Sequence, residues 1–302
     1  MPELRFDGRA VLVTGAGGGL GRHYALLLAA RGAGVVIADY GVSLHGEGTS
    51  SEPAESVAAE ITATGGAAAA CYASVSEPAG ATTMVEAALD TFGRLDAVVN
   101  NAGIVDHAWM DELDEAQVRR LLDNHAIGTF LVTKAAWPHL VASDAGRVVN
   151  TVSESMLGNT PKAISYAAAK GAVFGFTRGL ALDGRRHGVR VNAIAPRGTT
   201  RAHDPKVLAS VFEQPEESFG QEFFTAMRPE LVAPVVAYLA HESCSLDGEV
   251  LVAGAGRVCR LVVGETAGIV VPELVPEDVG EQISTILDTT ITEPMPVGFT
   301  AR

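Results

Sequence analysis

A glycine-rich segment between an apolar run and a helical stretch restricts the fold of this chain more than any other feature. Residues 10–13 are the apolar run, residues 14–21 (TGAGGGLG) are the segment, and residues 23–30 have helical spacing. In such a strand–loop–helix unit, glycines let backbone N–H groups approach a pyrophosphate, and the helix N-terminus favours its negative charge. The segment therefore predicts nucleotide binding, and a tight turn without a ligand is the alternative.

An acidic residue follows the second apolar run. Residues 34–38 (GVVIA) are typical of a buried strand, and Asp39 comes directly after them. A carboxylate at that place accepts hydrogen bonds from both hydroxyls of an adenosine ribose and repels a 2′-phosphate. No arginine stands among residues 40–42. We therefore expect NAD rather than NADP, and an aspartate that only caps a turn is the alternative.

Ser153, Tyr166 and Lys170 are the second group of candidate functional residues. Residues 147–152 (RVVNTV) are typical of a buried strand and residues 167–182 of a helix. Tyr166 and Lys170 are four positions apart, so one helix face carries both. A neighbouring ammonium lowers the pKa of a phenol from about 10, and such a tyrosine can take a proton from an alcohol. Ser153 would hold the substrate oxygen; the alternative is a helix whose Tyr and Lys face solvent.

Strand-like and helix-like stretches alternate along the chain. This alternation predicts the α/β class, with one doubly wound parallel sheet flanked by helices. The expected strands are residues 10–13, 34–38, 67–72, 95–99, 147–152, 189–194 and 249–253, and the expected helices are residues 23–30, 53–64, 78–92, 113–141, 167–182 and 229–240.

Three segments call for separate expectations. Residues 41–51 are rich in Gly and Ser, so we expect an exposed, mobile loop. Trp137-Pro138 predicts a kink or break in the helix around it. Residues 204–227 have mixed polarity and contain the pair Phe223-Phe224. They form either a lid over a substrate pocket or an ordinary pair of surface helices.

Charge and cysteine content restrict the partners. The chain has 302 residues and a formal net charge of −14. An acidic protein without Lys/Arg runs is a poor candidate for binding nucleic acid or an anionic membrane, so we expect neither. Cys71, Cys244 and Cys259 lack paired or metal-ligand spacing, which predicts reduced thiols and no metal. No apolar run reaches the roughly 18 residues that span a bilayer, and we expect a cytoplasmic protein.

Three motifs, in the same order and spacing over residues 6–255, resemble those of the short-chain dehydrogenase/reductases. They are T-G-x-x-x-G-x-G at residues 14–21, Asn-Asn-Ala-Gly at residues 100–103, and Ser153 followed by Tyr166 and Lys170. The resemblance implies a single-domain Rossmann-type fold and an NAD cofactor. It implies that Tyr166 is the acid/base, that Ser153 orients the substrate oxygen, and that Lys170 binds the nicotinamide ribose and lowers the tyrosine pKa. The cofactor-binding residues expected beside Asp39 are Gly15, Gly19, Leu20, Gly21, Ser74, Val75, Asn101, Ala102, Gly103, Tyr166, Lys170, Pro196 and Thr199.

A closer resemblance is to the (3R)-hydroxyacyl-CoA dehydrogenase domains of peroxisomal multifunctional enzymes. It rests on TGAGGGLGR with Tyr24 just after it, on Ala135-Ala136-Trp137, and on PELVAPVVAYLAHESC at residues 229–244. It implies an oxidoreductase that interconverts a 3-hydroxyacyl-CoA and a 3-oxoacyl-CoA with a fatty or steroid side chain. The alternatives are a hydroxysteroid dehydrogenase and, in another class, a catalytically silent NAD-binding sensor or scaffold.

The domain organisation follows from where the resemblance stops. Residues 1–257 are the expected NAD-binding domain, and residues 258–302 are a C-terminal extension that packs on the same domain or on a partner subunit. The extension holds two β-like runs within residues 258–271 and a short helix at residues 276–287. Apolar helices at residues 113–141 and 163–182 could bury the interface of a homodimer or homotetramer, or pack within the monomer.

His125 departs from the family pattern. The wider family places there an asparagine that completes a catalytic tetrad. A neutral imidazole also has one donor and one acceptor, so His125 could hold the same relay water, or it could be a hydrogen-bonded core histidine. Because an unburied imidazole titrates near pH 6.5, a relay role predicts that the acid limb of the pH–rate profile shifts when His125 is replaced by Asn.

Two further positions depart from the pattern. The acid expected after the third strand is replaced around Ala73-Ser74, which removes the expected adenine contact. Arg197 stands where a glycine usually follows the proline. A CoA thioester carries phosphates, so an acidic protein must supply local positive charge to bind it. Arg197 and Arg201 are the candidates for this role, and ordinary surface arginines are the alternative.

Overall fold

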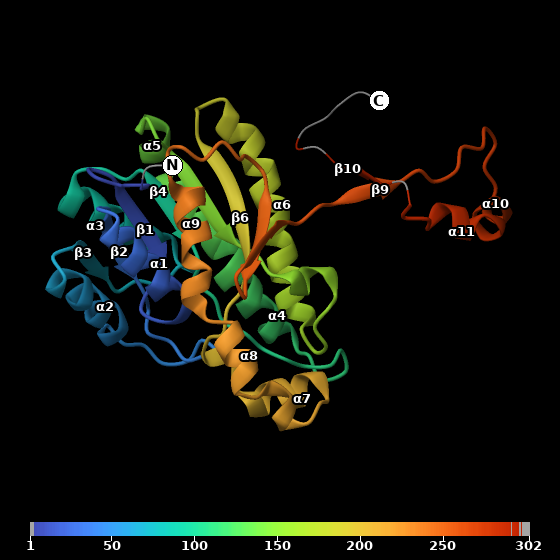
Figure 1. Ribbon diagram of the computed structural model, residues 1–302, viewed down its shortest axis with the longest axis horizontal. Helices are drawn as coiled ribbons and strands as arrows, with labels where there is room; N and C mark the ends of the chain where they lie inside the picture. The colour runs from blue at the N-terminus through green and yellow to red at the C-terminus, as the bar shows by residue number, and fades with distance from the viewer. Residues whose placement is uncertain (1–2, 291, 296, 298–302) are drawn as a thin grey trace. The chain divides into compact units, whose positions relative to one another are not determined.

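The computed structural model describes residues 3–290, 292–295 and 297 (Figure 1). The chain divides into two compact units, residues 1–259 and residues 260–302. Within the described residues, no single helix is long and apolar enough to cross a membrane, although the bent pair formed by residues 216–226 and 229–240 passes by length and composition. The division predicted after residue 257 and the packing of the extension stay predictions.

An eight-stranded sheet with the order β3-β2-β1-β4-β5-β6-β7-β8 forms the centre of the first unit (Figure 1). The strands from β1 to β7 pair in parallel. Val11, Val35 and Val148 have no exposed surface, as expected for strands covered by helices on both faces. The predicted α/β fold with a doubly wound parallel sheet is confirmed. The strands are β1 (Ala10–Thr14), β2 (Gly34–Ala38), β3 (Ala67–Cys71), β4 (Ala97–Asn100), β5 (Arg147–Thr151), β6 (Arg190–Arg197), β7 (Val250–Gly254) and β8 (Arg257–Arg260).

Helices pack on the sheet in separate groups. α1 contacts α2 and α9, whereas α3 contacts α5, and α4 contacts α6. Figure 1 shows α1 and α9 side by side in front of the strands. The chain order passes from β1 outward to β3 and then back to β4, so the carboxyl ends of β1 and β4 form the switch point where such sheets bind ligands. These helices are α1 (Gly19–Ala30), α2 (Glu52–Ala63), α3 (Pro78–Phe92), α4 (Glu115–Leu122), α5 (Gly128–Ala142), α6 (Ile164–Arg185) and α9 (Ala233–Ala240).

The helical stretch predicted for residues 113–141 is interrupted, but at a different place. A π-helical segment, η1 (Asp123–Ile127), separates α4 from α5. α5 continues through Pro138 to Ala142, so the helix does not break at Trp137-Pro138; the alternative of a kink there stays a prediction. Pro138 lacks the N–H that would bond four residues back, but it stands near the end of the helix, where the loss of one bond is tolerated.

The sixth strand is longer than predicted. β6 extends past Ile194 to Arg197 because β7 pairs with it as far as Gly254. A Cβ added at Gly254 would lie 2.1 Å from the carbonyl oxygen of Arg197, so this close pairing requires glycine. Pro196 and Arg197 are therefore fixed in the sheet rather than in a loop.

The second unit contains one antiparallel pair of short strands and two short helices. β9 (Gly264–Thr266) pairs antiparallel with β10 (Thr292–Pro294). The predicted helix over residues 276–287 is divided at Gln282 into α10 (Pro276–Glu281) and α11 (Ile283–Ile286). The hydroxyl of Thr266 donates a hydrogen bond of 2.7 Å to the carbonyl of Ile286, which ties this pairing to α11. The two β-like runs predicted within residues 258–271 correspond to β8, which begins one residue earlier at Arg257, and to β9.

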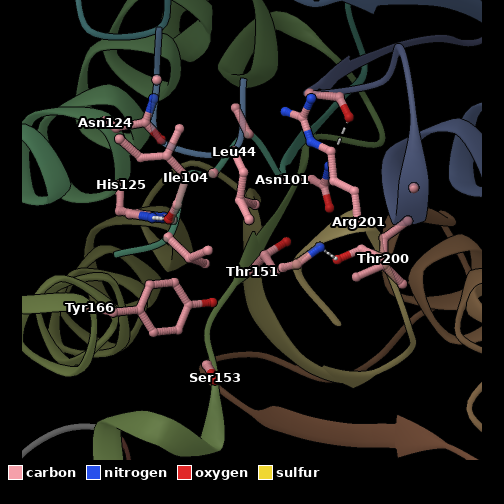
Figure 2. Close-up of a pocket in the computed structure, with 18 of the residues that line it drawn as sticks. Leu44, Asn101, Ile104, Asn124, His125, Thr151, Ser153, Tyr166, Thr200 and Arg201 are labelled. Atoms are coloured by element: carbon pink, nitrogen blue, oxygen red, sulfur yellow. Dashed lines mark hydrogen bonds between the residues drawn. The ribbon is translucent and has the colours of Figure 1, made fainter. Parts of the chain in front are cut away.

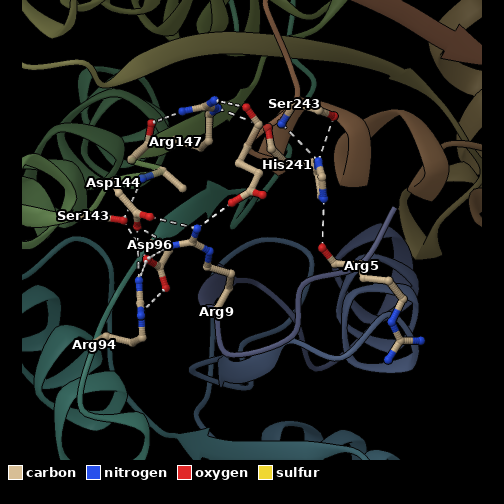
Figure 3. A network of polar contacts seen from close by, with 12 residues as sticks. Arg5, Arg9, Arg94, Asp96, Ser143, Asp144, Arg147, His241 and Ser243 are labelled. Atoms are coloured by element: carbon tan, nitrogen blue, oxygen red, sulfur yellow. Dashed lines mark hydrogen bonds and ion pairs between the residues drawn. The ribbon is translucent and has the colours of Figure 1, made fainter. Parts of the chain in front are cut away.

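A polar network joins the amino ends of the strands, away from the ligand-binding edge (Figure 3). Buried Asp96, just before β4, accepts hydrogen bonds from Arg94 at 2.6 and 2.8 Å, from Ser143 at 2.6 Å and from the backbone N–H of Ala10 at 2.9 Å. Arg9 pairs with Asp144 in the same network. The network fixes the start of β1 against the start of β4.

Candidate active site

The carboxyl ends of the strands open onto a cavity of about 1360 Å³, shown in part in Figure 2. Ligand pockets usually measure about 300–1,000 Å³, so this cavity has room for a cofactor and a substrate together. All but two of the residues predicted for the site line it. Those lining it are Gly15, Gly19, Leu20, Asp39, Ser74, Val75, Asn101, Ala102, Gly103, His125, Ser153, Tyr166, Lys170 and Pro196.

The two exceptions have other contacts. A Cβ at Gly21 would lie 2.2 Å from the carbonyl oxygen of Gly15, so Gly21 lets α1 pack closely behind the loop instead of forming the cavity wall. The N–H and the hydroxyl of Thr199 both donate to the carbonyl of Met227, at 2.7 and 3.0 Å. The next residue, Thr200, lines the cavity in its place.

The glycine loop has the shape of an anion cradle. Gly15 has a φ of 64°, and a Cβ there would lie 2.7 Å from the Cα of Ala102, so a side chain at this position is excluded. Gly18, the N-cap of α1, provides no side-chain cap. The N–H groups of the first turn are therefore available to a negatively charged ligand. These residues fit the diphosphate of a dinucleotide.

Asn101 holds β4 against the glycine loop. Its side-chain amide donates to the carbonyls of Thr14 and Gly15 at 3.0 and 3.2 Å. The hydroxyl of Thr14 accepts in return from the backbone N–H groups of Asn101 and Ala102, both at 3.0 Å. Asn101 therefore stabilises the floor of the cofactor side of the cavity.

Asp39 lies at the end of β2 and already orders the chain around it. Its Oδ2 accepts from the N–H of Gly17 at 2.8 Å, and its Oδ1 accepts from the N–H of Gly41 at 2.7 Å. Each carboxylate oxygen has a second lone pair. The side chain can therefore still accept from a ribose diol while it positions the glycine loop.

Residues 41–51, predicted to be an exposed and mobile loop, fold against the cavity, and only part of the segment is exposed. The N–H of Val105 donates to the carbonyl of Leu44 at 3.1 Å, and the N–H of Ser50 donates to the carbonyl of Tyr40 at 3.1 Å. Leu44 and Ile104 lie side by side in Figure 2 and line the cavity. Sequence reasoning missed Leu44 because its contacts come from a distant segment.

Ser153, after the end of β5, and Tyr166, at the start of α6, come together in the cavity (Figure 2). Lys170, one turn further along α6, lines the same cavity. Lys170 is buried, and its Nζ donates to the carbonyl of Thr151 at 2.7 Å. Burial lowers the pKa of Lys170 to about 7. Burial also raises the pKa of the half-buried Tyr166 to about 12, and a hydrogen bond with Ser153 opposes that rise.

The predicted lowering of the tyrosine pKa by Lys170 is not found in this structure. The ammonium lies 5.7 Å from the centre of the Tyr166 ring, and one of its N–H groups donates to the carbonyl of Thr151. Desolvation therefore dominates the pKa of the phenol. A cation beside the phenol oxygen would have to offset that desolvation before the tyrosine could act as a base.

His125 lies behind Tyr166, in the π-helical segment. Its Nε2 lies 2.7 Å from the carbonyl oxygen of Ile104, and its ring meets that of Tyr166 edge to face at 5.3 Å. Burial, followed by the charge of Lys170, holds the pKa of the imidazole well below its usual value. His125 is therefore neutral. Nδ1 is buried, as are Oγ1 of Thr151 and Oδ1 of Asn124, and none of the three has a partner among the described residues.

Arg197 is paired with a residue that sequence reasoning missed. Its Nε and Nη2 donate to the two carboxylate oxygens of Glu154, each at 2.7 Å. The pair connects the residue after Ser153 to the residue after Pro196 and lines the cavity. The carboxylate neutralises the charge of Arg197 in this structure, and the role of Arg197 in binding CoA phosphates stays a prediction.

Residues 204–227 form the apolar side of the cavity. They contain α7 (Pro205–Phe212), the 3₁₀ turn η4 (Glu216–Phe219) and α8 (Gln221–Ala226). Their rings follow one another, with centres 6.0 Å apart for Phe212 and Phe219 and 5.8 Å apart for Phe219 and Phe223. Of the two alternatives for this segment, its position over the cavity favours the lid. The apolar lining from this segment is Leu208, Val211, Phe212, Phe219, Phe223 and Met227.

Comparisons with known proteins agree with this geometry. Residues 9–209 match the family model described as short chain dehydrogenase. A short chain dehydrogenase from Mycobacterium avium superimposes with a TM-score of 0.78 and 33% identity, over 97% of this chain and 98% of that one.

Two longer proteins also match. Peroxisomal multifunctional enzyme type 2 of Mus musculus is 40% identical over 290 residues, which are 94% of this chain and 37% of that protein. The full-length Drosophila melanogaster enzyme of the same name has a TM-score of 0.75 and 31% identity, over 97% of this chain and 48% of that one. This chain thus spans less than half the length of both. It belongs to the short-chain dehydrogenase/reductase family, and is an oxidoreductase that acts on a CH–OH group and binds a nicotinamide dinucleotide.

Proposed function

We propose that this protein oxidises the secondary alcohol of a 3-hydroxyacyl-CoA to the 3-oxo group, with NAD as the acceptor. One observation carries the proposal: a single cavity combines Tyr166 and Ser153 with a dinucleotide groove that ends at Asp39 and with an apolar chamber. A dehydrogenase for a small polar alcohol would not need the chamber.

The cofactor assignment rests on Asp39. Its carboxylate lies at the end of β2 and keeps lone pairs free for a ribose diol. The same negative charge would repel a 2′-phosphate. No arginine follows Asp39 at residues 40–42, and the guanidinium that reaches this loop from β6, that of Arg201, donates to the backbone carbonyl of Val42. NAD is therefore the better fit.

The substrate assignment rests on the chamber. Phe212, Phe219 and Phe223 present aromatic rings to the cavity beside the candidate catalytic residues. An apolar chain that enters this chamber gains about 25 cal/mol for each Å² removed from water. The resemblance to (3R)-hydroxyacyl-CoA dehydrogenase domains supports an acyl-CoA among the apolar alcohols. A hydroxysteroid is the second substrate that such a chamber accommodates.

The residues of the chain supply binding and proton transfer. A bound nicotinamide would supply the acceptor for the hydride of the carbinol carbon. Ser153 orients the substrate oxygen by a hydrogen bond, and Oη of ionised Tyr166 takes the hydroxyl proton. In the reverse direction the protonated phenol donates to the carbonyl oxygen. Because burial raises the pKa of Tyr166 to about 12, the phenol is protonated at neutral pH, and oxidation should accelerate as the pH rises.

His125 is proposed to hold a water in the proton path behind the tyrosine. A carbonyl oxygen only accepts, so the bond to Ile104 requires the proton on Nε2 and leaves Nδ1 as an acceptor. The unpartnered oxygens of Thr151 and Asn124 are also buried. A water in contact with such groups would satisfy them.

Steady-state NADH formation with a panel of alcohols tests the proposal. The panel contains 3-hydroxyacyl-CoA esters of several chain lengths, both 3-hydroxy enantiomers, and a 17-hydroxysteroid, each with NAD and with NADP. The proposal predicts the highest kcat/KM for a (3R)-hydroxyacyl-CoA with NAD. The highest kcat/KM for the 17-hydroxysteroid would instead assign a hydroxysteroid as the substrate. Tight NADH binding without turnover of any alcohol would point to a sensor or scaffold.

A further inference from the structure

The cavity is lined by four arginines, and three of them have carboxylate partners. Arg119 pairs with Glu115, Arg120 with Asp106, and Arg197 with Glu154. Arg201 has no carboxylate partner in the part of the chain that the structure describes. Lys170 donates to a backbone carbonyl and is buried at the far end of the site. Arg201 therefore carries the cavity-lining guanidinium whose charge is not satisfied within the protein.

Arg201 reaches from one side of the cofactor groove to the other. It follows β6, and its Nη2 donates at 2.8 Å to the carbonyl oxygen of Val42, three residues after Asp39. The preceding residue abuts the glycine loop, because a Cβ at Gly19 would lie 3.3 Å from the methyl group of Thr200. Figure 2 shows the side chain of Arg201 extending past Asn101. The guanidinium thus lies between the first turn of α1 and the loop after β2.

A dinucleotide must place its diphosphate in this interval. Its adenosine ribose is expected at Asp39 and its nicotinamide near Tyr166 and Lys170, and the glycine loop lies between them. The diphosphate brings two negative charges into a protein with a net charge of −14. The helix N-terminus supplies only about half a positive charge. A guanidinium at this place would supply a full charge and a bidentate hydrogen-bond donor.

We propose that Arg201 binds the diphosphate of the cofactor and closes the groove over it. The bond to the Val42 carbonyl, a neutral acceptor, is exchanged for bonds to phosphate oxygens, and the loop at residues 41–51 stays beside the adenosine. Arg201 thus joins the cofactor-binding residues, in place of the CoA-binding role that its sequence position suggested. The inference rests on the proposed function only in requiring a dinucleotide in this cavity.

CoA also carries a diphosphate, so the test must separate the two sources. The structure favours the cofactor because Thr200 lies against Gly19 and because the side chain of Arg201 ends at Val42, near Asp39. ADP-ribose carries the diphosphate of the cofactor without the nicotinamide. Free CoA carries the diphosphate of the substrate without the acyl chain.

The experiment measures the affinity of both probes by calorimetry for four proteins: wild type, Arg201→Gln, Arg201→Lys and Arg186→Gln. Arg186 is an exposed arginine at the end of α6 that pairs with Asp183, so its variant carries the same charge change elsewhere. Arg201 is itself exposed, and thermal unfolding of each variant checks that the fold is retained. The rate of NADH release is measured in addition by stopped-flow fluorescence.

Loss of the charge-assisted bonds should weaken ADP-ribose binding by tenfold or more in Arg201→Gln and by less in Arg201→Lys. Arg186→Gln should bind ADP-ribose as tightly as the wild type does. The affinity for free CoA should be the same in all four proteins. NADH release should accelerate in Arg201→Gln, because the groove no longer closes over the cofactor. Unchanged ADP-ribose affinity would overturn the inference, as would a loss confined to CoA. Failure of the wild-type protein to bind ADP-ribose would instead contradict the proposed function as well.

Discussion

Nε2 of His125 lies 2.7 Å from the carbonyl oxygen of Ile104, and this contact leaves Nδ1 as a buried acceptor without a protein partner among the described residues. If Nδ1 holds a relay water, His125→Asn should keep much of the activity because an amide also has a donor and an acceptor. His125→Ala should lose most of it. Steady-state rates of the two variants test this, with exposed His187→Ala as the control. Equal rates for all would leave His125 as core packing.

The burial of His125 corrects the expectation that this residue affects the acid limb of the pH–rate profile. An unburied histidine titrates near pH 6.5, but burial and the charge of Lys170 hold the pKa of His125 well below that. The imidazole therefore stays neutral over the range in which activity would be measured. The acid limb of the pH–rate profile should be the same for wild type and His125→Asn.

Asp39 should set the cofactor preference. Asp39→Asn keeps an acceptor near the N–H of Gly17 but removes the negative charge that faces a 2′-phosphate. The ratio of kcat/KM for NAD to that for NADP should fall by about tenfold or more, since hydrogen bonds to charged groups are worth about 1.5–3 kcal/mol. Equal use of the two cofactors by the wild-type protein would refute the assignment.

Phe223 should contribute more to the binding of long acyl chains than to that of short ones. Its ring lines the cavity, whereas that of the neighbouring Phe224, 5.4 Å away between centres, does not. Phe223→Ala should raise KM for long-chain 3-hydroxyacyl-CoA more than for short-chain esters, because the lost apolar contact scales with the buried chain. Phe224→Ala is the matched control. A uniform change across chain lengths would argue against the chamber as the acyl site.

Asp96 should contribute to the free energy of unfolding without affecting the catalytic rate. Removal of a buried, ion-paired carboxylate leaves its partners unpaired, so Asp96→Ala should lower the free energy of unfolding by about 3–5 kcal/mol. Asp144→Ala, an exposed carboxylate in the same network, should cost much less. Hydrogen bonds to Arg94, Ser143 and Ala10 outweigh burial and hold the pKa of Asp96 below its usual value.

The sign of the pH effect at Asp96 follows from that lowered pKa. Since the folded state binds this proton more weakly than the unfolded state, the stabilisation is present above the unfolded pKa of about 3.9. It is lost as the pH falls through the lower pKa of the folded state. Urea denaturation at neutral pH and at acid pH should therefore show a gap between wild type and Asp96→Ala that narrows in acid. A gap that is constant with pH would contradict this account.

Much of this architecture could be predicted from the sequence because its determinants are local. The central strands are short apolar runs bounded by glycine or polar residues, and the parallel sheet follows from their alternation with helices. Tyr166 and Lys170 share one helix turn, and Asp39 follows its strand directly. Local spacing was therefore enough to name these residues.

The remaining features depend on contacts between distant segments. Glu154 and Arg197 are separated by 43 residues and meet only because β5 and β6 are neighbours. The loop at residues 41–51 is held by Val105, which lies far along the chain. The amino-acid composition of the π-helical turn at His125 does not distinguish it from an ordinary α-helix. Local propensity carries no information on such pairings, so the arginine partners and the inner face of the loop could not be predicted.

Tyr166→Phe tests the central claim most directly, since it removes only the oxygen that transfers the proton. The measurement is the rate of NADH formation from NAD and a long-chain (3R)-hydroxyacyl-CoA, with NADH affinity measured separately. If Tyr166 is the base, the variant should bind NADH like the wild type and lose about 10²–10⁴ in rate. A rate within a few-fold of the wild-type value, with NADH affinity unchanged, would contradict the account.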